Sequence, residues 1–145
     1  MTLLELIIAC AILLILSSAA LPIAKYSVIR QKEAELRRDL REMKDAIDRY
    51  KDTADRNQIR VEIGSEGYPP DLETLVKGVQ LGASSDRKIR FLRKVPVDPM
   101  TGQADWGLRA VQDDPDSTSW GGKNVFDVYS KSTRTALDGT KYSDW

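Results

Sequence analysis

The sequence predicts an α+β protein in which one long N-terminal helix carries a small head with a short helix and an antiparallel sheet of about three strands. Residues 1–24 are almost wholly apolar, and residues 25–57 combine apolar and charged side chains with the period of an amphipathic helix. Residues 58–145 hold short segments rich in β-branched and aromatic residues, separated by turn-forming residues. We therefore expect a hydrophobic transmembrane segment at 1–24, its amphipathic continuation at 25–57 and a globular head at 58–145.

The apolar segment contains a single charge. A helix of about 20 apolar residues spans the hydrocarbon core of a bilayer. Glu5 is the only charged residue between positions 1 and 24, and a carboxylate at the centre of a membrane helix costs about 2.5–3.5 kcal/mol, less toward its ends. Glu5 is therefore predicted to have a functional partner. A cleavable secretory signal is disfavoured because no Lys or Arg precedes Lys25, whereas a plain single-pass anchor remains an alternative.

Pro22 lies inside the predicted helix and removes one backbone donor. Ser17 and Ser18 make the same region easier to loosen, so we expect a kink or local unwinding across residues 17–23. A helix of about 55 residues would be about 80 Å long, at 1.5 Å per residue. A domain of this size does not enclose such a helix, so its apolar half must contact lipid or other copies of itself.

The amphipathic segment carries one narrow apolar stripe. The stripe fits a coiled coil about as well as packing on the same chain, and we favour the same chain because the head needs a core. The stripe consists of Ile29, Leu36, Leu40, Met43, Ile47 and Tyr50. The charged residues are interpreted as a solvated face with i, i+4 pairs, namely Glu33/Arg37, Asp45/Arg49 and Asp52/Arg56.

The head is predicted to begin with a short helix at residues 72–77, capped by Asp71 and stopped by Gly78. Residues 59–63 are expected to be extended, residues 89–95 to form a strand or helical turn, and residues 112–123 to form a loop. Three strands are expected to form an antiparallel meander across the long helix, at residues 106–111, 125–130 and 142–145.

The composition disfavours nucleic-acid binding and catalysis. Lys and Arg balance Asp and Glu at 22 each, which gives no electrostatic case for binding nucleic acid. The chain has no His and a single Cys, Cys10, inside the apolar segment. The usual general bases and thiol nucleophiles are therefore missing, and we predict no enzyme and no catalytic residue.

The N-terminus resembles the mature N-terminus of type IV pilins and type II secretion pseudopilins, through Met1-Thr2-Leu3-Leu4-Glu5-Leu6 and the apolar helix to Pro22. In that superfamily a prepilin peptidase removes a short basic leader, and the new first residue, usually Phe, is N-methylated. The resemblance implies that Met1 carries this methylated amine and that Glu5 pairs with the N-terminus of a neighbouring subunit. It also implies a partly melted segment around Pro22 in the filament. A removed basic leader would resolve the topology conflict, since Lys25 and Arg30 alone would place the head in the cytoplasm.

The head adds to the resemblance. Three motifs and a terminal Trp145 recur in the same order in the major pseudopilin of type II secretion: Tyr68-Pro69-Pro70-Asp71-Leu72, Val95-Pro96-Val97-Asp98-Pro99 and Phe126-Asp127-Val128-Tyr129-Ser130. A C-terminal cysteine pair, common in type IVa pilins, is absent from the sequence. The similarity therefore implies a type IV pilin-like fold and a pseudopilin.

Such a subunit would wait in the bacterial inner membrane with a periplasmic head. It would then polymerise into a periplasmic filament that serves protein export. The implied partners are other copies of the chain, minor pseudopilins, the inner-membrane assembly platform and prepilin peptidase, with no nucleic acid. Two alternatives stay open: a type IV pilin-like subunit of an extracellular filament, and a membrane-anchored binding module that does not polymerise.

Calcium is the one cofactor that the resemblance raises. Major pseudopilins typically bind Ca²⁺ in their last loop through two Asp side chains and backbone carbonyls. Asp138 and Asp144 are the candidates here, although the acidic, glycine-rich insert that normally carries the second ligand is missing. Asp138-Gly139 is also an ordinary turn sequence, so a turn that binds no metal is the alternative.

Overall fold

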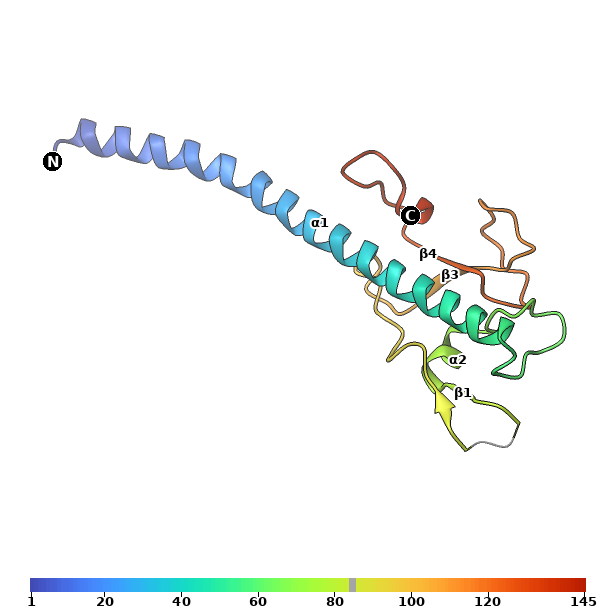
Figure 1. Ribbon diagram of the computed structural model, residues 1–145. Coiled ribbons are helices and arrows are strands. Elements are labelled where there is room, and N and C mark those ends of the chain that lie inside the picture. Colours follow the sequence, from blue (N-terminus) through green and yellow to red (C-terminus); the bar gives the residue numbers. More distant parts are fainter. Residues whose placement is uncertain (84–85) are drawn as a thin grey trace.

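The computed structural model describes residues 1–83 and 86–145. Its dominant element is the helix α1, Leu3–Asp55, of 53 residues, whose first half projects away from the head as a free arm (Figure 1). At 1.5 Å per residue this helix is about 80 Å long. The long N-terminal helix is thus confirmed.

α1 is unbroken through Pro22 in the isolated chain. Pro22 has no N–H to donate to the carbonyl of Ser18, and the Ser18 hydroxyl donates to the carbonyl of Ile15 at 2.8 Å. The ribbon follows a gentle curve and stays helical here (Figure 1). Unwinding of residues 17–23 inside a filament stays a prediction.

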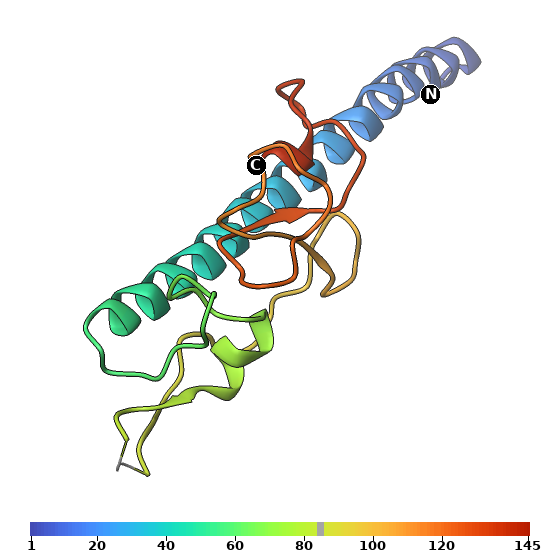
Figure 2. The same cartoon turned by 90° about the vertical axis from the view of Figure 1, so that its right-hand side faces the viewer.

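The second half of α1 packs on the head, as the apolar stripe predicts. It contacts the strand β4, Asp127–Ser130, and the helix α2, Leu72–Lys77. Figure 2 shows the head lying along one side of this half of the helix. Ile29 is only half-buried, so the buried stripe begins at Leu36, two turns later than predicted. Its buried apolar members are Leu36, Leu40, Met43, Ala46, Ile47, Tyr50 and Ala54.

The short helix α2 occupies the predicted residues. The Asp71 carboxylate accepts a hydrogen bond from the Thr74 amide at 2.7 Å, which caps the first turn. Gly78 ends the helix with φ of +80°, and a Cβ there would lie 2.6 Å from the carbonyl oxygen of Ile89. Both the turn and the close approach therefore require glycine.

Among the described residues, the strands form two sheets of two strands each, so the prediction of one three-stranded meander is wrong. β1, Val79–Gln80, pairs antiparallel with β2, Lys88–Ile89. β3, Trp106–Arg109, pairs antiparallel with β4, with Trp106 opposite Ser130 and Arg109 opposite Asp127.

The predicted last strand is instead the 3₁₀ helix η1, Tyr142–Asp144. The hydroxyl of Tyr142 and the indole of Trp145 are held by side chains of α1 and of the preceding turn, rather than by a ladder of backbone hydrogen bonds. Residues 59–63 form no strand. Residue 59 is a bend, residues 60–62 have no regular secondary structure and a turn begins at Ile63, with Ile59 buried and Ile63 fully exposed.

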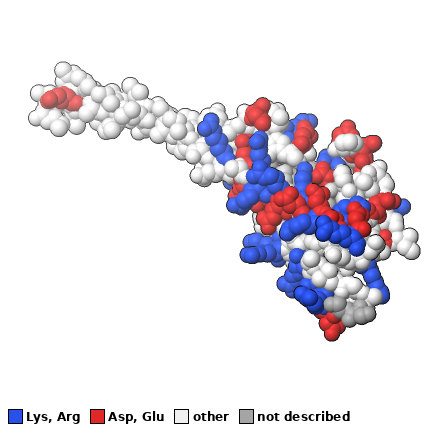
Figure 3. Space-filling view, viewed as in Figure 1, with Lys and Arg blue, Asp and Glu red and all other residues white. Residues whose placement is uncertain are grey.

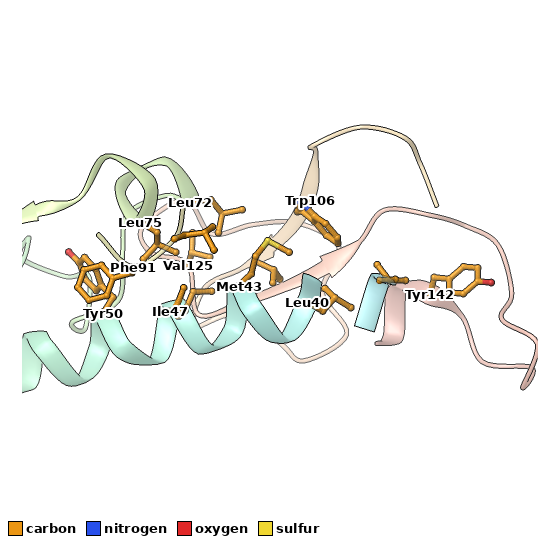
Figure 4. Close-up of a cluster of buried hydrophobic side chains, with 14 of the residues drawn as sticks. Leu40, Met43, Ile47, Tyr50, Leu72, Leu75, Phe91, Trp106, Val125 and Tyr142 are labelled. Atoms are coloured by element: carbon orange, nitrogen blue, oxygen red, sulfur yellow. The ribbon is translucent and has the colours of Figure 1, made fainter. Parts of the chain in front are cut away.

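The core lies between α1 and the head. Met43 and Ile47 of α1 face Leu75 of α2, Val125 and Trp106 (Figure 4). The segment between β2 and β3 is hydrogen-bonded to this core, because the Trp106 indole donates to the Pro96 carbonyl at 2.9 Å. The motif at residues 95–99 therefore contributes to the fold rather than to a reactive site.

Candidate assembly site at the N-terminus

The arm of α1, residues 1–28, is exposed along its whole length. Its large aliphatic side chains, from Leu3 to Ile23, have no contact partner in the head, and the most apolar window is 0% buried. Figure 3 shows the outer part of the arm as an uncharged surface with one acidic patch near its end, while charges gather on and beside the head. A continuous apolar surface of this kind marks a contact with lipid or with another protein. Among the described residues, α1 is the one helix long and apolar enough to cross a membrane.

Glu5 closes a capping box at the start of this arm. Its Oε2 accepts hydrogen bonds from the Thr2 amide at 2.9 Å and from the Thr2 hydroxyl at 3.1 Å. In return, the Glu5 amide donates to the Thr2 hydroxyl at 3.2 Å. Two backbone amides at the helix start are thereby satisfied. The sequence pattern Thr-x-x-Glu at positions 2–5 is the signal of this motif, and the sequence reasoning above missed it.

The capping box fixes how Glu5 is presented. Both donations from Thr2 reach Oε2, and Oε1 accepts no hydrogen bond within the described residues. Within the described residues, the exposed ammonium of Met1 forms no ion pair. The Met1 ammonium and the half-occupied carboxylate of Glu5 thus lie within five residues of each other. Such a pair of groups can join two chains.

Pro22 lies near the other end of the arm, where the helix loses one backbone hydrogen bond. The missing donor leaves this turn with one backbone hydrogen bond fewer, although it is helical in the isolated chain. Unwinding at Pro22 and pairing at Glu5 both stay predictions.

Both calcium candidates are exposed: Asp138 lies in a turn, and Asp144 is the last residue of η1. Asp138 Oδ1 accepts from the Thr140 hydroxyl at 2.6 Å and from the Thr140 amide at 2.9 Å, and Oδ2 pairs with Arg37 at 3.6 Å. These donations from Thr140 hold the pKa of the Asp138 carboxyl below its usual value, and the charge of Arg37 adds to the effect. Asp144 accepts only from the Ser143 hydroxyl, at 3.4 Å.

This arrangement does not fit a calcium site. Ca²⁺ takes six to eight oxygen ligands, whereas both oxygens of Asp138 already have partners. In the part of the chain that the structure describes, His, Cys, Asp and Glu form no group of three or more that could hold a metal ion.

No family model, curated protein or solved structure matches this chain.

Proposed function

We propose that this chain is the structural subunit of a helical filament, and that it polymerises through the arm of α1. The observation that carries the proposal is the arm itself, since residues 1–28 form an exposed, largely apolar helix with a single acidic group, Glu5, beside a free ammonium. The resemblance to pseudopilins names the filament as the pseudopilus of a type II protein export system.

The apolar side chains alone do not favour the filament over the membrane. Lipid tails cover them as well as a neighbouring helix does, so moving the arm from lipid into a bundle brings little hydrophobic gain. Glu5 makes the difference, because a carboxylate is costly in hydrocarbon unless it is paired. Pairing of its Oε1 with a neighbour's ammonium removes this cost on assembly.

The same pair explains an open-ended polymer. The ammonium of one chain contacts the carboxylate of the next, so the two surfaces in contact are different. A repeated contact of this heterologous kind does not close on two copies, and it generates a ring or a helical filament.

In this proposal, the subunit waits in the bacterial inner membrane as a single-pass protein with a periplasmic head, after prepilin peptidase has exposed Met1. Minor pseudopilins and the inner-membrane assembly platform are the partners during extraction. A type IV pilin-like subunit of an extracellular filament would use the same arm in the same way.

One observation favours a different class of function. Because Thr2 already donates two hydrogen bonds to Glu5, the carboxylate has a role in an isolated helix, as it would in a membrane-anchored binding module. The two roles of Glu5 require different properties of its side chain. Capping requires a hydrogen-bond acceptor, whereas assembly requires a negative charge.

The test uses Glu5→Gln in cells that contain the export machinery. Glutamine serves in a capping box as glutamate does, so the variant keeps the cap and loses the charge. We expect the variant to enter the membrane normally and to form no filaments by electron microscopy of sheared material. Glu35→Gln, which removes a carboxylate outside the arm, is the matched control and should form filaments. Normal filaments from Glu5→Gln would refute pairing and leave the anchored module as the better account.

A further inference from the structure

The C-terminal segment, residues 131–145, is fastened to α1 by two charged side chains one helical turn apart, Glu33 and Arg37. Glu33 Oε1 accepts from the Leu137 amide at 2.9 Å and from the Tyr142 hydroxyl at 2.9 Å. Both Figure 1 and Figure 2 show the end of the chain, in red, beside the middle of α1. Residues more than 100 positions apart in the sequence are thereby joined directly.

Arg37 completes a closed set of contacts. Its guanidinium pairs with Asp138 at 3.6 Å and lies 4.1 Å from the centre of the Trp145 ring. The Trp145 indole donates to the Thr140 hydroxyl at 2.7 Å, and that hydroxyl donates to Asp138 at 2.6 Å. Asp138, Thr140 and Trp145 are thus held together around one cation.

A metal ion would have to break this arrangement. A dication bound by Asp138 would lie close to the guanidinium of Arg37, and charges of like sign at such a distance repel. It would also have to displace the two donors of Thr140 from Oδ1. The contacts that close the last loop therefore compete with calcium rather than prepare a place for it.

We infer that the last loop of this chain is closed by the side chains of Glu33 and Arg37, and that it has no calcium site. The positive charge that neutralises Asp138 comes from α1 itself. We name Glu33 and Arg37, with the groups they hold, the α1 clamp. This inference concerns the unassembled chain, so it stands or falls independently of the proposed filament.

The experiment follows the Leu137 amide by hydrogen exchange in the full-length protein in detergent micelles, with calcium and with excess chelator. Glu33→Ala removes the acceptor of that amide, and we expect its exchange to become on the order of tenfold faster. The matched control is Glu35→Ala on the same helix, because the Glu35 carboxylate contacts Arg38 at 3.8 Å. That control should leave exchange at Leu137 unchanged.

A second set of variants uses Arg37→Ala, with Arg30→Ala on the same helix as the control. Arg37→Ala should speed exchange at the amides of both Leu137 and Thr140, while Arg30→Ala should change neither. In the wild type, calcium and chelator should give the same exchange rates and the same melting temperature. Slower exchange at Leu137 in calcium than in chelator would overturn the inference. Unchanged exchange at Leu137 in Glu33→Ala would also overturn it.

Discussion

Asp98 is the fully buried carboxyl group that joins the loop after β2 to the sheet of β3 and β4. It accepts from the Ser130 hydroxyl at 2.6 Å and from the Met100 amide at 2.7 Å. A hydrogen bond to a charged group contributes about 1.5–3 kcal/mol, and removing the acceptor leaves two buried donors without partners. Burial of the carboxyl group offsets part of this gain. Asp98→Ala should therefore lower the free energy of unfolding by about 2–4 kcal/mol.

Asp105→Ala in the same loop is the matched control for this prediction. Asp105 is exposed and pairs with Lys131 at 2.7 Å, and an exposed pair of this kind contributes less than about 1 kcal/mol. The assay is thermal and denaturant unfolding of the full-length chain in detergent, followed by tryptophan fluorescence. Each kcal/mol should lower the melting temperature of a head of this size by roughly 4 °C. The reasoning would be refuted if Asp98→Ala were no more destabilising than Asp105→Ala.

Two further predictions concern the same sheet and its loop. A Cβ at Gly107 would overlap the ring of Tyr129 on the paired strand, so Gly107→Ala should destabilise the head by about 1–3 kcal/mol in denaturant unfolding; a change below about 0.5 kcal/mol would contradict the clash. Asp113 accepts from the amides of Ala110 at 2.8 Å and Gly121 at 2.9 Å, and these bonds lower the pKa of its carboxyl group. Its stabilising effect is therefore present above the pKa of an unfolded Asp and is lost as the pH falls through the lower pKa of the folded protein. Asp113→Asn should flatten the acid limb of the stability–pH curve, and an unchanged acid limb would count against this role.

The helices could be predicted from the sequence because their signals are local. A period of 3.6 residues marks α1, and the cap at Asp71 with the stop at Gly78 fixes α2. The strands are harder, since β1 and β2 have two residues each and so short an element shows no period. The end of the chain contains β-forming residues, but its conformation is decided by side-chain contacts with α1.

The charged side chains of α1 show where local reasoning fails. The spacing predicts intrahelical pairs, and Asp52 and Arg56 do pair, at 3.0 Å. Arg49 instead donates to the Phe91 carbonyl at 2.7 Å. Glu33 and Arg37 both turn to the C-terminal segment, a choice that depends on which part of the head lies opposite. Spacing along one helix cannot reveal such a partner.

At the candidate site, the sequence alone identifies Glu5 as the unusual group, because one carboxylate in an apolar segment needs a partner. The capping box with Thr2 is also visible in the sequence, as Thr-x-x-Glu at positions 2–5. The structure adds that both hydrogen bonds from Thr2 go to one oxygen of Glu5.

The most direct test of the central claim is the structure of the assembled filament, at a resolution that places the side chains of the arm. We predict that Glu5 Oε1 lies about 2.7–2.9 Å from the N-terminal amine of a neighbouring subunit, while Oε2 keeps its bonds to Thr2. A filament in which Glu5 contacts only its own Thr2, with the neighbour's amine elsewhere, would contradict the account.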